Sequence, residues 1–216
     1  MTAPIPLESR RDAPTSKLLL TLGTAGAVAG LAIVFVFRGT QPTIARYKAE
    51  QLRLAVQEVL QQPDRFDTLY VVDGALTADR PTGAIEAYEK VFMGFRGADR
   101  VGYAINAGQP GFQDVIELIF GYEPERQSVL GMKVLESKET PGLGDKIEKD
   151  EAFVSQFNGA VTPLVPIKPR EATGDPHEVD MITGATISSR TVIRSINAAL
   201  EQYSPLIAAY REPGGQ

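Results

Sequence analysis

Cysteine is absent from this chain of 216 residues, and histidine occurs once, as His177. Without thiolates the chain cannot hold an iron–sulfur cluster of the usual type, a thioether-linked haem or a disulfide. A single histidine also leaves too few ligands for a zinc site of the His/Cys type. His177 lies in a proline-rich stretch, where an exposed histidine is the ordinary outcome. Any redox chemistry must therefore come from an organic cofactor.

An excess of basic charge is also absent, since the net charge is −5. Phosphate backbones bind to basic surfaces, so this balance argues against a nucleic-acid partner. Hydrophobic residues make up 43% of the chain and charged residues 23%, which is enough for a packed core. The length suits one membrane anchor and one domain of ordinary size.

One long apolar run stands out near the N-terminus. Leu18–Phe37 contains 20 uncharged residues between Lys17 and Arg38. At 1.5 Å per residue, a helix of this length covers roughly 30 Å, the thickness of a bilayer core. We expect a transmembrane helix at 18–37, preceded by an N-terminal tail at 1–17. The alternative is a cleaved signal peptide, but the run exceeds a typical signal core and no small-x-small site follows it.

Charge does not decide the orientation of this helix, because Lys and Arg occur on both of its sides. The shortness of the N-terminal tail favours a cytoplasmic N-terminus. We therefore expect a single-pass protein of the inner membrane, with its soluble domain on the periplasmic side.

The region from 43 to 94 is predicted to lie next to the membrane. A break at 39–42 precedes an expected helix at Ile44–Gln61, whose apolar residues recur at helical spacing. Thr68–Asp73 is typical of a strand, and Ala84–Met93 is predicted to form a short helical run.

The following region, 95–203, is predicted to be the main domain, with a C-terminal tail at 204–216. The expected strands are Val101–Asn106, Asp114–Phe120 and Ser128–Leu135. The expected helices are Lys149–Phe157 and Ser188–Tyr203, with an irregular, proline-rich stretch at Val161–Asp180 between them. Short connections favour antiparallel pairing. The fold class is α+β: one N-terminal transmembrane helix and a domain with a mostly antiparallel sheet flanked by helices.

A first polar segment, Asp180–Ser189, opens the last expected helix. Its Thr and Ser residues suit a helix start, and glycine permits a tight turn. The unpaired N–H groups and positive dipole of a helix start suit a phosphate. Arg190 and Arg194, four residues apart, would add positive charge nearby. A plain helix cap without a ligand is the alternative.

A second segment, Glu139–Lys146, holds two glycines and a proline after an expected strand. Such a composition forms a tight exposed loop, which can lie against a flat ligand with little obstruction. The alternative is a turn that binds nothing.

These two segments resemble those of the RnfG/NqrC family. The flavinylation motif of that family is Asp, two variable residues, Ser or Thr, then Gly-Ala-Thr, and the chain matches every fixed position. In the family, the last Thr of the motif is bonded through its oxygen to the phosphate of FMN, and a separate flavin transferase makes the bond from FAD. The resemblance implies that Thr186 carries FMN and that Asp180 and Thr183 belong to the pattern recognised by the transferase.

The family also carries a Thr-Pro-Gly-Leu-Gly loop beside the flavin ring, and this chain matches that loop completely. The resemblance extends over residues 95–203. The cofactor-binding residues that it implies are Thr186, Thr183, Gly184, Ala185, Asp180, Glu139, Thr140, Pro141, Gly142, Leu143 and Gly144.

The resemblance further implies an electron-relay subunit of an Rnf-type complex, which couples electron flow between ferredoxin and NAD to ion movement. Other membrane and peripheral subunits of that complex would be its partners. No set of acid, base and nucleophile is evident, which fits a relay. Three alternatives stay open: a C subunit of a sodium-pumping quinone reductase, an anchored flavin domain serving another extracytoplasmic reductase, and a non-redox anchor or assembly protein.

Overall fold

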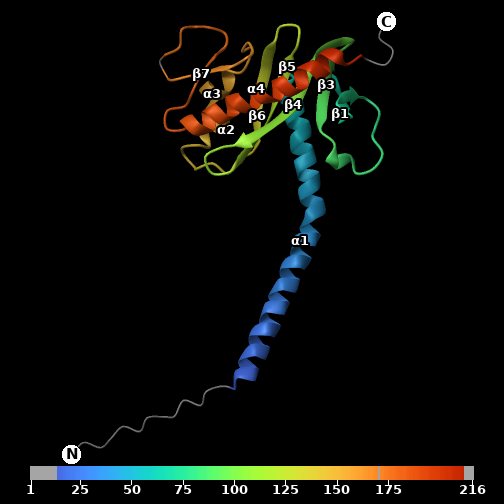
Figure 1. Ribbon diagram of the computed structural model, residues 1–216, viewed down its shortest axis with the longest axis vertical. Helices are drawn as coiled ribbons and strands as arrows, with labels where there is room; N and C mark the ends of the chain where they lie inside the picture. The colour runs from blue at the N-terminus through green and yellow to red at the C-terminus, as the bar shows by residue number, and fades with distance from the viewer. Residues whose placement is uncertain (1–13, 170, 212–216) are drawn as a thin grey trace, which may run out of the picture. The chain divides into compact units, whose positions relative to one another are not determined.

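The computed structural model describes residues 14–169 and 171–211, and it divides into two compact units, Met1–Ala49 and Glu50–Gln216. Helix α1 (Thr15–Val59) belongs to both units (Figure 1). Residues 1–13 of the predicted tail lie outside the described residues.

The predicted break at 39–42 is wrong, because α1 continues through it with Pro42 inside the helix. A proline removes one helical hydrogen bond and crowds the preceding turn, at a cost of about 3 kcal/mol. Here both flanking sequences are helical in pattern, so one proline does not end the helix.

The N-terminal part of α1 has the length and composition of a membrane-spanning helix. Its side chains from Thr15 to Ala49 are all exposed within the chain, including eleven large hydrophobic residues between Leu18 and Phe37. A lipid environment would cover such a surface. This part of the helix is the single-pass anchor of the protein.

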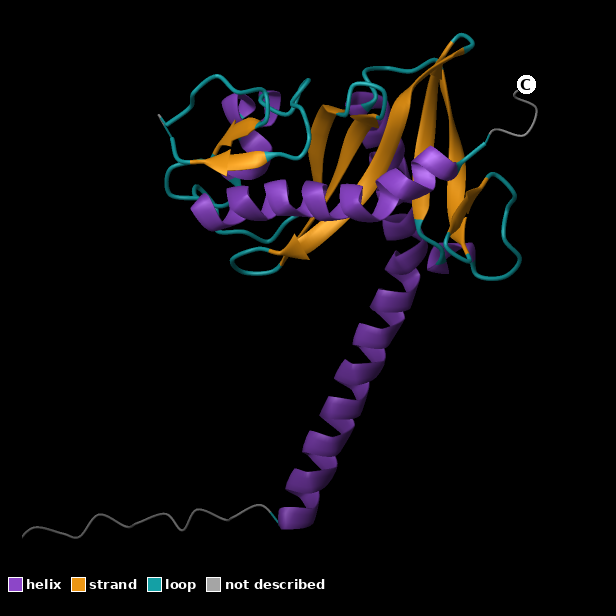
Figure 2. Ribbon diagram, turned by 45° about the horizontal axis from the view of Figure 1, so that its top comes forward, coloured by secondary structure: helices purple, strands orange, loops and turns teal. Residues whose placement is uncertain are grey.

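The second unit is built on a six-stranded antiparallel sheet with the order β2-β1-β3-β4-β5-β6 (Figures 1 and 2). The strands are β1 (Arg65–Val72), β2 (Ala75–Thr77), β3 (Lys90–Arg96), β4 (Asp99–Pro110), β5 (Val115–Glu123) and β6 (Ser128–Glu136). The predicted strand at 68–73 and the three predicted strands from Val101 onward correspond to β1, β4, β5 and β6. The predicted antiparallel pairing is confirmed for β4 with β5 and for β5 with β6.

The predicted helical run at Ala84–Met93 is wrong. Only a single 3₁₀ turn, η1 (Ile85–Ala87), forms there, and β3 follows it. The five consecutive residues from Val91 to Phe95 are buried. A strand covered on both faces has a continuous apolar run instead of an alternating one, which periodicity does not separate from a helix.

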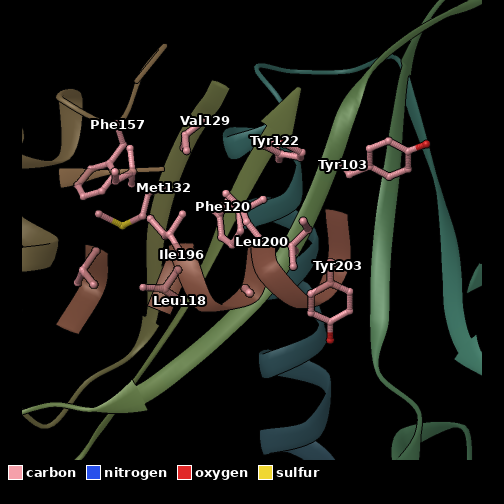
Figure 3. Close-up of a cluster of buried hydrophobic side chains, with 14 of the residues drawn as sticks. Tyr103, Leu118, Phe120, Tyr122, Val129, Met132, Phe157, Ile196, Leu200 and Tyr203 are labelled. Carbon is pink, nitrogen blue, oxygen red and sulfur yellow. The ribbon is translucent and has the colours of Figure 1, made fainter. Parts of the chain in front are cut away.

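Different helices pack on the two faces of the sheet. On β5, Ile116, Leu118 and Phe120 join the larger core, whereas Ile119 joins the smaller one around the C-terminal end of α1. The larger core also contains the residues of α4 that face the sheet, and Figure 3 shows Ile196 and Leu200 of α4 with Leu118 and Phe120 of β5. The alternation of period two along β5 therefore builds two hydrophobic layers.

A glycine lets α1 approach the sheet. A Cβ on Gly121 would overlap the carbonyl oxygen of Val59, at the end of α1. No other residue leaves room for this backbone contact. Nearby, a Cβ built on Gly94 would lie 2.8 Å from Cδ1 of Leu60, a side-chain atom of the residue that follows α1.

The C-terminal part contains α2 (Lys146–Lys149), α3 (Glu151–Ser155), β7 (Val165–Ile167), β8 (Glu178–Asp180) and α4 (Thr186–Ala209). The single helix predicted at Lys149–Phe157 is instead two short helices, because Asp150 leaves the helical conformation and caps α3. The stretch predicted to be irregular contains a small parallel sheet, β7 with β8.

Helix α4 is longer than predicted. It begins at Thr186 instead of Ser188 and ends at Ala209 instead of Tyr203, with Pro205 inside it. Ile207 packs into the core beyond Pro205, which explains why the helix continues. Figure 2 shows α4 lying across one face of the sheet.

Candidate functional site

A tight turn presents Thr186 at the start of α4. The N–H of Ala185 donates to the carbonyl of Ile182 at 3.0 Å, and Gly184 in this turn has φ +86°. The positive φ explains the glycine at position 184 of the motif. Thr186 is exposed and is the first residue of the helix.

Ser189 fixes this turn from the inside. Its hydroxyl accepts from the N–H of Ile182 at 3.1 Å and donates to the carbonyl of Ala185 at 2.9 Å. Ser189 is fully buried. These two bonds stabilise the turn, and the N–H groups of the first turn of α4 have no partner within the helix, at the positive end of the helix dipole. This arrangement suits a phosphate group.

The loop Glu139–Gly144 lies against this turn. Gly142 has φ +78°, and the N–H of Leu143 donates to the carbonyl of Thr140 at 3.1 Å. A Cβ built on Gly184 would lie 3.6 Å from Leu143 Cδ2. The structure thus brings together the two segments that the sequence singled out, although about forty residues separate them.

A third segment joins the site, and the sequence analysis missed it. The backbone N–H groups of Phe112 and Gln113 donate to Oε1 of Glu139, at 2.9 and 3.1 Å. The side-chain amide of Gln113 also donates to the hydroxyl of Thr140, at 2.7 Å. The signal for this segment in the sequence is weak, because Gly111 and the two residues after it are typical of any strand connection.

Each of the three joined segments presents an exposed apolar side chain. These are Phe112, Leu143 and Ile187, with exposed fractions of 65%, 48% and 50%. One aromatic and two aliphatic side chains, on segments that meet at the start of α4, suit a ligand with a flat ring and a phosphate. The residues present therefore fit FMN.

Asp180 lies at the end of β8, six residues before Thr186. Its backbone pairs with the side chain of Gln156: the N–H of Asp180 donates at 2.7 Å, and Gln156 Nε2 donates to its carbonyl at 3.2 Å. The carboxyl oxygen Oδ1 is buried and has no hydrogen-bond partner among the described residues. Asp180 is thus partly buried, whereas Thr183 is exposed in the turn.

The two arginines differ in their surroundings. Arg194 donates to the hydroxyl of Thr191 at 3.2 Å, and that hydroxyl in turn donates to the carbonyl of Pro110. Arg190 is exposed, one helical turn after Thr186. Arg190 is therefore the better placed of the two to meet an anion at the helix start. The ring of His177 lies 3.1 Å from the carbonyl of Pro163, which is a structural contact.

A cavity of about 340 Å³ lies elsewhere in the second unit, and none of the predicted site residues lines it. Its lining residues are Glu58, Met132, Lys133, Val134, Glu148, Lys149 and Val154. Within the described residues, no three His, Asp or Glu side chains gather as a metal site would require. The surface around Thr186 is therefore the candidate site.

Comparison with known proteins agrees with this geometry. The family model described as FMN-binding domain matches residues 111–201. The G subunit of the ion-translocating oxidoreductase complex of Methanosarcina acetivorans is 30% identical over 189 residues, which are 88% of this chain and 94% of the relative. The chain belongs to the RnfG/NqrC family.

Further relatives place the chain within this family. The G subunit of the Na⁺-translocating ferredoxin:NAD⁺ oxidoreductase complex of Acetobacterium woodii is 28% identical over 88% of this chain and 92% of its own length. NqrC of Shewanella oneidensis has the same fold, with a TM-score of 0.61 and 20% identity over 76% of this chain and all of that structure. This RnfG/NqrC protein is thus an FMN-binding, electron-transferring subunit of an ion-translocating oxidoreductase.

Proposed function

We propose that the protein carries FMN bonded covalently to Thr186 and relays electrons within an Rnf-type, ferredoxin- and NAD-linked complex. The observation that carries this proposal is the exposed Thr186 at the first position of α4, beside the loop Glu139–Gly144. A helix start stabilises the negative charge of a phosphodiester, and the apolar side chains nearby suit a ring.

The attachment reaction balances with FAD as the donor. Thr186 Oγ forms a bond to the phosphorus nearest the flavin, the pyrophosphate bond of FAD breaks, AMP leaves and the hydroxyl proton is lost. A flavin transferase would catalyse this step. The exposure of Thr183 and Thr186 would let such an enzyme reach the turn, whereas Asp180 would act from a partly buried position.

The protein's own residues would then hold the group in place. The ring system supplies the one- and two-electron chemistry when bound. The N–H groups of the first turn of α4, which have no partner within the helix, and Arg190 would meet the phosphate, and Leu143 would lie against the ring. Of the remaining loop residues, Thr140, Pro141 and Gly142 shape the backbone around Leu143, and Gly144 packs on Glu139.

A covalent bond has a physical advantage on the far side of the membrane, where a dissociated FMN could not be replaced from the cytoplasmic pool. We therefore place the flavin-carrying region, 95–203, on the periplasmic side of the inner membrane, next to the other subunits of the complex. The A. woodii relative, which is named for ferredoxin and NAD⁺, supports the choice of redox partners.

The experiment is a pair of threonine substitutions in the full chain, produced together with a flavin transferase. Thr186→Val should abolish flavin fluorescence of the protein band on a denaturing gel. Thr82→Val, a control at another exposed threonine, should keep the full signal. Equal fluorescence of both variants would refute attachment at Thr186.

A further inference from the structure

The side chain of Glu139 is the point at which the three segments of the site meet. It is 6% exposed and accepts three hydrogen bonds, two of them from the amides of Phe112 and Gln113. The third comes from the hydroxyl of Ser188 at 2.6 Å. Ser188 is 2% exposed and lies two residues after Thr186 in the first turn of α4. One carboxylate thus links the loop, the β4–β5 connection and the helix start.

Two glycines leave room for the carboxylate of Glu139. A Cβ built on Gly111 would lie 2.5 Å from Oε1 of Glu139. A Cβ built on Gly144 would lie 2.7 Å from Oε2 and 3.1 Å from the hydroxyl of Ser188. Larger residues at either position would displace the carboxylate. With three donors and two backbone segments around it, the carboxylate has little surface left for a ligand.

We propose that Glu139 is a positioning residue of the flavin site, acting through Ser188 and the two amides and not through contact with the flavin. This inference rests on the proposed attachment at Thr186. The network keeps the exposed side chains of Phe112, Leu143 and Ile187 in a fixed arrangement. Phe112 donates its own amide to Glu139, Leu143 lies in the same loop as Glu139, and Ile187 precedes Ser188, which donates its hydroxyl to Glu139.

Two variants of Glu139 separate the effect of its hydrogen bonds from that of its negative charge. In Glu139→Gln, the side-chain oxygen can accept from both amides while its NH₂ group donates to Ser188. Glu139→Ala leaves all three donors without this acceptor, and one of them, the Ser188 hydroxyl, is buried. Glu117→Ala, at an exposed position on β5, removes a carboxylate from outside the site and is the matched control.

The first readout is independent of flavin. Full-length protein made without the transferase is compared by hydrogen exchange in detergent. Glu139→Ala should speed exchange of the amides at 112 and 113 by about tenfold or more, since both amides lose the acceptor of their hydrogen bonds. Glu139→Gln and Glu117→Ala should stay close to the wild type. Wild-type exchange in Glu139→Ala would overturn the proposal.

The second readout uses flavinylated protein. The visible circular dichroism of the attached flavin should be weakened in Glu139→Ala and restored in Glu139→Gln. If Glu139→Gln instead matched Glu139→Ala in both readouts, the negative charge would be the essential property and the positioning role would be refuted. A wild-type protein without flavin would refute the attachment at Thr186, while the exchange data would still decide whether Glu139 holds the three segments.

Discussion

Asp145, directly after the loop Glu139–Gly144, forms an ion pair with Lys149 one helical turn later. The distance between the Lys149 ammonium and the Asp145 carboxylate is 2.8 Å. The hydrogen bond from Lys149 lowers the pKa of Asp145 below its usual value of 3.8. A carboxylate with a lowered pKa stabilises the folded state above its unfolded pKa, and this contribution is lost as the pH falls through the folded pKa.

We therefore expect Asp145→Asn to be less stable than the wild type at pH 7, and the difference to shrink as the pH falls below about 3.8. Thermal unfolding of the detergent-solubilised protein between pH 7 and pH 3 measures this convergence. Glu151→Gln, an exposed acidic position at the start of α3, is the control. A stability difference between Asp145→Asn and the wild type that stays constant over this range would contradict the assignment.

Individual site residues were only partly predictable from the sequence. The two motifs contain Thr186 and Leu143, and their spacing within each motif predicted the turn and the loop. The contribution of Phe112 and Gln113 could not be predicted, because it depends on a tertiary contact made by their backbone amides. Backbone donors have no signature in the sequence, so only the folded structure reveals them.

Among the elements, α4 connects the site to the core. Its buried face includes Val192, Ile193, Ile196 and Leu200, as the periodicity predicted. Its first turn meets Glu139 through Ser188, and the hydroxyl of Tyr203 donates to Glu89 at 2.9 Å farther along. The helix is therefore held at both ends as well as along its buried face.

We expect Ile196→Ala to destabilise the protein by about 2–5 kcal/mol, because a fully buried side chain is replaced by a cavity. Chemical denaturation followed by the flavin signal and by far-ultraviolet circular dichroism measures the loss. Glu201→Ala, on the exposed face of the same helix, should change stability by less than about 0.5 kcal/mol. Equal losses in the two variants would show that α4 does not pack as described.

The elements that sequence analysis missed share a cause. Strand β3 is buried on both faces, so its run of apolar residues lacks the alternation of an ordinary strand. Pro42 has the local signature of a break, but α1 continues because its neighbours on both sides favour the helix. Local patterns were sufficient for β4, β5, β6 and most of α4. They failed where burial or a long helix outweighed the local preference.

At the scale of the whole molecule, the chain has an anchor and a sheet domain as separate compact units. The apolar side chains from Leu18 to Phe37 have no partner within the described part of the chain, whereas Ala55, Val56 and Val59 pack on the sheet. The residues from Leu18 to Phe37 therefore face the lipid, and the packing of Ala55, Val56 and Val59 contributes to the folding of the domain.

We expect a chain that starts at Glu50 to be soluble and folded, and the full chain to remain in the membrane fraction after high-salt washing. Fractionation followed by immunoblotting checks both. A second truncation, starting at Gln61, also removes the helical residues that pack on the sheet and should aggregate. Release of the full chain by high salt would refute membrane anchoring by α1.

The most direct test of the central claim is the mass of the protein purified from its native membrane, followed by peptide mapping. We expect an added mass of one FMN less one water, located on Thr186 within the peptide that spans Asp180 to Arg190. An unmodified Thr186, in cells that flavinylate other proteins, would contradict the account.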